Sequence, residues 1–376
     1  MRLAIVGAAV GTILAIPGLA GAGDPRLEFD LHPPVAFLLE NGGRRDALLT
    51  IDARNPGDKL VRVEHVRVRY YEHDTLLGTL DPATSIFTRA DLLSDPRVEP
   101  AGRDVWASLC LNPPTALTDR VRFEFDLVSR NGVHKTRATQ RLDVPLHAPI
   151  APPVLAFPVS GSWRITQGHT CDTKHRRGRL GGEYAWDFVA VDEKTGHSGV
   201  PGFAASHKNG DSATFGRPVT APLAGTIVSV VDGTDDNDAQ REFPSRSAVE
   251  SARAPLWIFG NHVILDAGGG VFVLLAHMRK DSIVVKSGDA VREGDVLGQA
   301  GNSGNTMLPH LHVQVMDGPN PDDPAVNGKP ALFRDYVELL ASLDGRAIDA
   351  IVRRVASGDP PEGAVIASRD AAVRAP

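Results

Sequence analysis

Residues 309–315, Pro-His-Leu-His-Val-Gln-Val, alternate in side-chain type, which is the pattern of a β-strand rather than of a helix. Side chains two positions apart in a strand share a face, so His310 and His312 lie roughly 6.5–7 Å apart on one side. Two such imidazoles suit a metal site with a neighbouring base, because imidazole binds zinc and titrates near neutral pH. The pair alone also fits a solvated strand face.

A second apolar run, residues 184–191, contains one carboxylate. With a period of two, Asp187 shares a face with Ala185 and Val189, where an unpaired charge costs several kcal/mol or more. Asp187 therefore needs a cation or a place at the rim of a cleft. A metal ion and an arginine would both serve.

A third run, residues 271–277, ends in His277 and follows residues 261–266 through the turn sequence Ala-Gly-Gly-Gly. This arrangement predicts a β-hairpin with His277 at a strand end. A histidine at a strand end is also commonly just exposed to water.

Together these segments resemble the lysostaphin-like zinc metallopeptidases, the LytM-type peptidoglycan endopeptidases. The resemblance spans roughly residues 155–320 and includes residues 219–228, 276–278, 291–298 and 301–305. It implies a zinc ion held by a histidine, an aspartate and the second histidine of His-x-His, with a fourth position for water. Asp187 and His312 are then ligands. His277 and His310 are the catalytic histidines that orient or deprotonate the water and support the tetrahedral intermediate.

The first histidine ligand departs from the common pattern, which places it four residues before the aspartate, where this chain has Glu183. Other members carry it further upstream across a loop. We predict His175, because the Arg- and Gly-rich stretch 176–182 has the backbone freedom to loop back. His169 is the second choice, and Glu183, whose carboxylate could also bind zinc, is the third.

The ligand set implies its own chemistry. Three protein ligands leave one position open on zinc, and the pKa of water bound there falls to about 7. The sequence has no His-Glu-x-x-His segment, so the base has to be a histidine, and His277 or His310 fits that role. Asn302 and Asn305 are candidates to position substrate, although ordinary turn chemistry explains them better.

The N-terminus predicts export. Met1 and Arg2 open a short basic region, residues 3–19 are apolar and small, and Ala20-Gly21-Ala22 matches a signal-peptidase site. We therefore expect residues 1–22 to be a signal peptide and the mature protein to be periplasmic or extracellular. The alternative is an uncleaved anchor, and only then would the protein contact a membrane.

Two cysteines are present, Cys110 and Cys171. In an oxidising compartment an even number invites pairing, so a disulfide between them is a hypothesis. It would join the N-terminal region to the loop that carries the expected ligands. Cys171 as a zinc ligand is disfavoured, because no second cysteine lies at metal-binding spacing.

The 376 residues predict a mostly β protein with several parts. Short alternating segments over residues 24–147 indicate an immunoglobulin-like antiparallel β-sandwich without a constellation for chemistry, suited to placement, to binding a protein partner or to covering the cleft. A Pro-rich linker follows at 148–154, and the LytM-type antiparallel β-sheet peptidase domain at 155–320. We expect a short helical C-terminal tail at 321–356, from the spacing of Tyr336, Leu339, Leu340, Leu343 and Ile348, and a disordered end at 357–376.

Composition excludes one class of partner, because a net charge of −6 with interspersed signs does not suit nucleic-acid binding. The residues predict a zinc site on a β-rich scaffold, with one zinc per chain, and the family resemblance implies an exported endopeptidase that cuts peptide bonds in bacterial peptidoglycan. The alternatives are an inactive wall-binding or hydrolase-activating module and a zinc hydrolase of another peptide or amide.

Overall fold

The computed structural model describes most of the chain beyond residue 23. The described residues are 24–32, 36–41, 44–81, 97–98, 105–131, 133–147, 151–169, 175, 180–192, 195–197, 208–237, 258–323, 325–341 and 347–368. The predicted signal peptide, 1–22, lies outside them, as does Cys171, so neither the signal peptide nor the disulfide with Cys110 is tested. Within these ranges no helix combines the length and apolar character that crossing a membrane requires.

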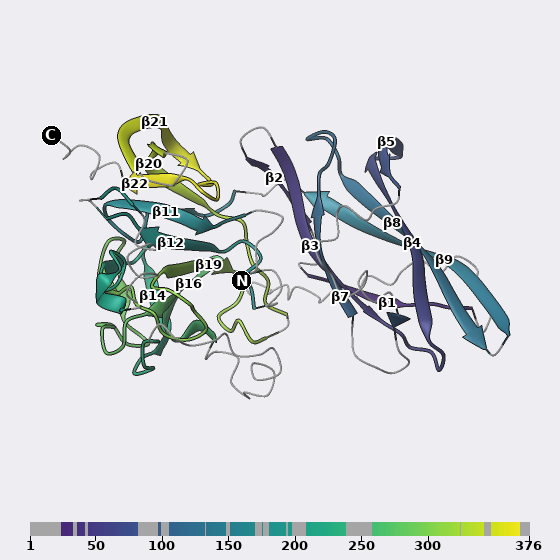
Figure 1. Ribbon diagram of the computed structural model, residues 1–376, viewed down its shortest axis with the longest axis horizontal. Coiled ribbons are helices and arrows are strands. Elements are labelled where there is room, and N and C mark those ends of the chain that lie inside the picture. Colours follow the sequence, from purple (N-terminus) through teal and green to yellow (C-terminus); the bar gives the residue numbers. More distant parts are fainter. Residues whose placement is uncertain are drawn as a thin grey trace, which may run out of the picture. The chain divides into compact units, whose positions relative to one another are not determined.

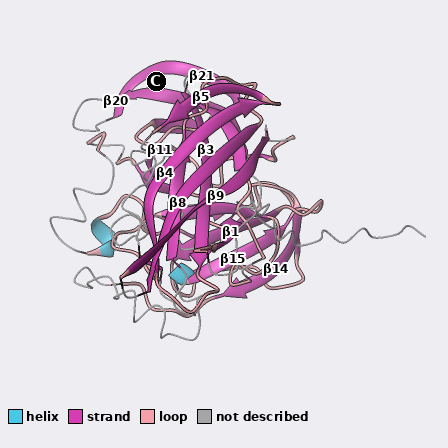
Figure 2. Ribbon diagram, turned by 90° about the vertical axis from the view of Figure 1, so that its right-hand side faces the viewer, coloured by secondary structure: helices cyan, strands magenta, loops and turns pink. Residues whose placement is uncertain are grey.

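The chain divides into two units, residues 1–150 and 151–376, and the division falls in the segment expected to be a linker. Strands account for nearly all regular structure in both units (Figure 2). The described ranges contain no α-helix, and η3 (Asn209–Asp211) is a single 3-10 turn. The mostly β character expected from the sequence is confirmed.

The N-terminal unit is a sheet of nine strands, all but β6 labelled in Figure 1. The strand order is β1-β3-β2-β9-β8-β4-β5, with β6 paired to β4 and β7 paired to β3. All pairs are antiparallel except β2 with β9. The strands are β1 (Glu28–His32), β2 (Ala36–Asn41), β3 (Arg44–Arg54), β4 (Val61–Glu72), β5 (Thr75–Leu80), β6 (Arg97–Val98), β7 (Val105–Leu111), β8 (Arg120–Asn131) and β9 (His134–His147).

Alternation explains the core of this unit. Val66 and Val68 on β4, like Phe123 and Phe125 on β8, are buried in this core, while Arg67 and Glu124 between them lie on the opposite face of the sheet. One apolar cluster joins these strands to Leu49 and other residues of β1, β3 and β7, so two layers of the sheet share a core.

The C-terminal unit is built on a sheet of eleven strands and a separate pair, β13 with β18. The strand order is β10-β20-β22-β11-β12-β19-β16-β15-β14-β17, with β21 paired to β20 (Figure 1). The strands are β10 (Val154–Leu155), β11 (Ser162–Gln167), β12 (Trp186–Ala190), β13 (Pro218–Thr220), β14 (Gly225–Val231), β15 (Asn261–Asp266), β16 (Phe272–Met278), β17 (Ala290–Val291), β18 (Val296–Gln299), β19 (Leu311–Met316), β20 (Leu332–Ala341), β21 (Ala347–Gly358) and β22 (Val365–Ser368). The expected hairpin of residues 261–266 and 271–277 is present as β15 and β16.

Three neighbouring strands, β12, β19 and β16, position the residues that the sequence singled out. Trp186 and Phe188 of β12 belong to the main core of the unit, so Asp187 between them points to the opposite face. The antiparallel register places Asp187 opposite His312 of β19. Strand alternation and register therefore bring two residues that are far apart in the sequence to one face of the sheet.

The predicted helical tail is wrong, because residues 332–341 and 347–358 form two paired strands, β20 and β21. The helical spacing has a local cause. The pairing of β20 with β21 shifts register between Glu338 and Leu339 and again between Leu339 and Ala341, so strand alternation is interrupted inside the stretch that carries the spacing. Apolar residues at Tyr336, Leu339 and Leu340 then imitate one face of a helix.

The predicted disordered end is also wrong in part. Val365–Ser368 form β22, which lies between β20 and β11 and so belongs to the same sheet as Asp187. Its apolar side chains complete the core beside β11. Residues 369–376 lie outside the described ranges.

Phe333 provides a test of this C-terminal extension. Its ring is fully buried and lies 4.4 Å from the ring of Phe157 and 4.9 Å from that of Trp186, centroid to centroid. We expect Phe333→Ala to lower the free energy of unfolding of the C-terminal unit by about 3–5 kcal/mol, the usual cost of a buried phenyl-sized cavity. Calorimetry of the full chain would measure this, with the exposed Val284→Ala as control. An unchanged transition would contradict the packing role of β20.

Candidate active site

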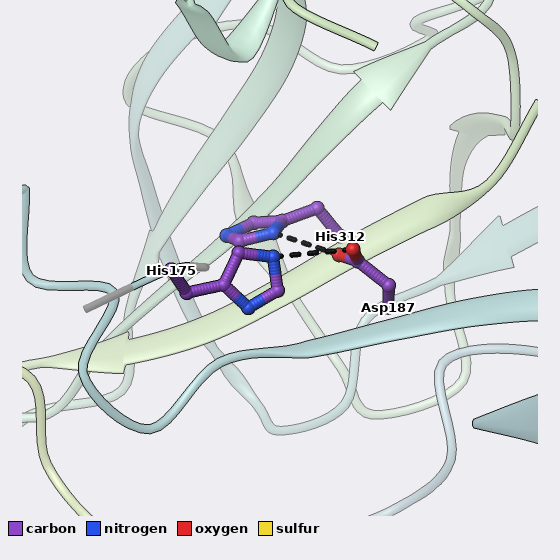
Figure 3. A group of neighbouring side chains, drawn as sticks. All are labelled: His175, Asp187 and His312. Carbon is purple, nitrogen blue, oxygen red and sulfur yellow. Dashed lines mark hydrogen bonds and ion pairs between the residues drawn. The ribbon is translucent and has the colours of Figure 1, made fainter. Parts of the chain in front are cut away.

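Three side chains converge on one point of the C-terminal unit (Figure 3). Potential ligand atoms of His175, Asp187 and His312 all lie within 4.8 Å of one another. The Asp187 carboxylate is central, with Oδ2 3.1 Å from His175 Nε2 and Oδ1 3.0 Å from His312 Nδ1. Two imidazoles and one carboxylate form a donor set that zinc commonly takes in hydrolases.

The sheet and a preceding segment supply these three groups. Asp187 and His312 are buried on adjacent strands, while His175 comes from the segment before β12 and is partly exposed. The His175 and His312 rings meet edge to face at a centroid distance of 4.7 Å. The structure thus brings together the three residues that the sequence predicted as ligands, although their role as zinc ligands stays a prediction.

The two other candidates for the first ligand lie elsewhere. His169 is buried against Trp186, and its ring nitrogens contact Tyr184 O at 2.6 Å and Asp359 Oδ2 at 2.8 Å. Glu183 Oε2 accepts a hydrogen bond from Gly328 N at 2.7 Å. Both side chains fasten segments of the fold, and neither joins the cluster around Asp187.

The hydrogen bonds indicate which nitrogen of His312 is free to bind a metal. Leu180 O can only accept, so the amide nitrogen of Gln314, 2.8 Å away, must face it. Gln314 Oε1 then faces His312 Nε2 at 2.8 Å and must receive its proton. A neutral His312 ring therefore turns its Nδ1 lone pair toward the Asp187 carboxylate, and two acceptors this close require a cation between them. The residues present fit a divalent metal ion.

Burial and mutual attraction shape the charges here. Burial raises the pKa of the Asp187 carboxyl, but attraction and hydrogen bonding from His175 and His310 outweigh it and hold this pKa well below its usual range. Burial lowers the pKa of His312 and outweighs the opposing effect of Asp187. An ionised aspartate beside a neutral imidazole is the protonation state that metal binding needs.

His277 lies at the end of β16, beside the cluster. Its Nδ1 donates to Ser303 O at 2.8 Å, so Nε2 carries the free lone pair. Its ring centroid is 4.5 Å from that of His310 and 5.8 Å from that of His312. Burial, together with repulsion from these two rings, holds the pKa of His277 well below its usual value. The ring is thus neutral and able to accept a proton.

His310 directly precedes β19. Its Nδ1 lies 2.9 Å from Leu308 O and 3.0 Å from Thr306 Oγ1, which ties this nitrogen to the preceding loop. Its Nε2 lies 3.4 Å from Asp187 Oδ1. Burial lowers the pKa of His310, but attraction and hydrogen bonding from Asp187, with the bond to Leu308, outweigh burial and raise it. Of the two histidines predicted to be catalytic, His277 therefore favours the neutral form and His310 favours the protonated form more than a free imidazole does.

The two asparagines predicted to position substrate are part of the loop before β19. The amide of Asn302 is fully buried and donates to Asn209 Oδ1 at 2.9 Å and to Asn237 O at 3.1 Å. The backbone N–H of Asn305 donates to Ile258 O at 2.8 Å. These bonds hold the loop together, and a role in substrate binding stays a prediction.

Sequence reasoning missed Gln314, which contacts a ligand directly. Its side chain is fully buried and follows His312 by two positions, on the same strand face. The alternation that joined His310 to His312 extends to Gln314, so the signal was present in the pattern.

A β-sheet domain with a His-Asp-His cluster and two more buried histidines beside it defines the class of mononuclear metal hydrolases. Residues 206–324 match the sequence model of Peptidase family M23. This match assigns the segment to the lysostaphin- and LytM-like metallopeptidases, and the C-terminal unit keeps an intact His-Asp-His triad. The matched segment contains His312 but begins after His175 and Asp187.

Comparison with solved structures gives distant similarities, and a search of curated proteins finds no match. The catalytic domain of lysostaphin from Staphylococcus simulans is 19% identical, covering 42% of this chain and 80% of its own, with a TM-score of 0.23. A zinc-containing peptidase from Vibrio cholerae is 14% identical, covering 77% and 82%, with a TM-score of 0.26. The catalytic domain of the prophage-encoded M23 protein EnpA from Enterococcus faecalis is 17% identical, covering 49% and 93%, with a TM-score of 0.25. The family assignment rests on the sequence match and the site.

Proposed function

We propose that this protein is an exported zinc endopeptidase that hydrolyses peptide bonds of bacterial peptidoglycan, in cross-links or stem peptides. The observation that carries the proposal is the convergence of His175, Asp187 and His312, with His277 and His310 beside them. The match of residues 206–324 to family M23 supports the substrate class and, with it, export to the cell wall. An inactive module would have no need to keep all five groups.

Zinc bound by these three residues would polarise a water molecule and the scissile carbonyl. The protein's own groups supply the proton transfers. His277 offers Nε2 as proton acceptor, because Ser303 O holds the proton on Nδ1. The proton can then pass from this nitrogen to the leaving amine. His310 carries positive charge more readily, so it is suited to stabilise negative charge that develops on the carbonyl oxygen.

We assign the N-terminal unit an accessory role, as an immunoglobulin-like module that places the enzyme or binds a protein partner. Its outward charges are largely paired on the sheet. Arg122 Nε lies 2.6 Å from Asp143 Oδ1, and the buried Glu124 contacts Arg67 and Arg141 at 3.1 Å each. A surface whose charges neutralise one another in this way suits a support for the enzyme better than a second reaction centre.

The test is digestion of purified peptidoglycan by the mature protein. We expect release of soluble fragments with new amino termini, seen by mass spectrometry, and about one zinc per chain by elemental analysis. Removing the metal with a chelator should lower the rate by about 10³-fold, because the metal contributes several kcal/mol to catalysis, and zinc should restore it. A zinc-loaded protein that releases no fragments would favour the inactive wall-binding or hydrolase-activating module. Cleavage of other peptides alone would favour a different zinc peptidase.

A further inference from the structure

Gln314 is a fully buried polar residue in the middle of β19, with both ends of its amide in use. Its Oε1 accepts from His312 Nε2 at 2.8 Å. Its Nε2 donates to Leu180 O at 2.8 Å and lies 2.9 Å from Met316 Sδ. A buried amide with each donor and acceptor satisfied has one orientation, so the whole chain of bonds is directional.

The first consequence concerns His312. An acceptor at Nε2 keeps the ring proton there and leaves Nδ1 as the metal-binding atom. The bond also fixes the plane of the ring, because Nε2 must stay in line with Gln314 Oε1. By bonding to Nε2, Gln314 thus fixes the orientation and protonation of Nδ1, on the other side of the ring.

The second consequence concerns the segment that carries His175. Leu180 lies in that segment, and Gln314 holds its carbonyl. The neighbouring glycines fit closely there. A Cβ on Gly181 would lie 2.8 Å from Met316 Cγ, and one on Gly182 would lie 3.5 Å from the backbone oxygen of His175. Gln314 and Met316 therefore form the surface that Leu180, Gly181 and Gly182 contact, and Gly182 in turn lies next to His175.

We infer that Gln314 is a positioning residue that couples two zinc ligands. Through Oε1 it selects the metal-binding nitrogen of His312, and through Nε2 it anchors the segment that delivers His175. This inference rests on the proposed zinc site. It adds that part of the affinity for zinc is built by a side chain that does not touch the metal.

Two substitutions separate the two halves of this role. Gln314→Met keeps the size but removes the acceptor and the donor. Gln314→Glu keeps an acceptor for His312 but sets a carboxylate against Leu180 O. Thr214→Val is the control, because Thr214 is equally buried and its hydroxyl accepts from Ala190 N at 2.9 Å, away from the ligands.

The measurement is the zinc dissociation constant of the full chain, by competition with a chromophoric chelator, together with the melting temperature without metal. We expect Gln314→Met to weaken zinc binding by about 10–100-fold, as loss of a ligand's hydrogen-bond partner typically does. Gln314→Glu should recover part of this loss. Thr214→Val should lower the melting temperature and leave the zinc constant unchanged. Nitrogen-15 NMR should show the proton of His312 on Nε2 in the wild type.

Other outcomes would overturn the inference. Binding by Gln314→Met within twofold of wild type would remove the coupling role, and equal losses in the Met and Glu variants would remove the acceptor role. An equal loss in Thr214→Val would reduce the effect to general destabilisation. Tight zinc binding in the wild type without peptidoglycan cleavage would refute the proposed function alone. A wild type that binds no zinc would refute both.

Discussion

Replacing Asp187 with asparagine is expected to empty the zinc site and abolish hydrolysis. The carboxylate is the shared contact of the cluster, 3.1 Å from His175, 3.0 Å from His312 and 3.4 Å from His310. Asparagine has the same shape but no charge, so three imidazoles and a divalent ion would face a neutral amide. We expect zinc affinity to fall by more than about 100-fold, beyond the range for residues that only support a ligand.

Elemental analysis of the variant should show zinc far below one per chain, and fragment release from peptidoglycan should fall to background. Asp266→Asn is the matched control, since Asp266 ends β15 and its Oδ1 accepts from Gly268 N at 2.7 Å, a bond that asparagine preserves. Full zinc content in the Asp187→Asn protein would remove Asp187 from the ligand set. Loss of zinc from Asp266→Asn would show that the effect is not local.

Replacing His277 with alanine should also abolish activity, but the protein should keep its zinc. His277 contacts the rings of His310 and His312 but lies outside the cluster of three potential ligands. Loss of the proton acceptor should lower the rate by about 10²–10⁴-fold, the usual contribution of general acid–base catalysis. The zinc content should stay near that of the wild type.

Zinc content and the rate of peptidoglycan cleavage should be measured on the same preparations of the wild type and of His277→Ala. His134→Ala, an exposed histidine of the N-terminal unit, is expected to change neither zinc content nor rate. If His277→Ala lost its zinc together with its activity, His277 would be a ligand rather than a base. If it cleaved peptidoglycan at the wild-type rate, the base would have to be His310 or another group.

Local pattern predicted the strands of the site well, because a period of two is visible in a few residues. Alternation alone predicts which face of its strand Asp187 and His312 each occupy. It does not predict that the two side chains touch, because they are 125 positions apart in the sequence and only the sheet order places β12 beside β19. The resemblance to a known family supplied that pairing. The choice of His175 rests on the backbone freedom expected of residues 176–182, and the structure places His175 next to Asp187.

The errors in the C-terminal part have physical causes. Register shifts on either side of Leu339 in β20 break the alternation and leave a spacing that resembles a helix. The polar stretch after residue 357 gave no sign of β22, because a strand of four residues gains its stability from β11 and β20 on either side. Whether a segment this short forms a strand is decided by the neighbouring strands it pairs with and not by its own sequence.

The backbone of His277 has a further consequence. Its φ of 58° is a left-handed conformation that costs a branched or bulky side chain on the order of 1–3 kcal/mol, and that glycine or asparagine adopts more readily. The chain gives up conformational stability at this position to keep an imidazole there. Replacing His277 with glycine would therefore release backbone strain and remove the proposed proton acceptor in one step, so backbone relaxation and activity are opposed at this position.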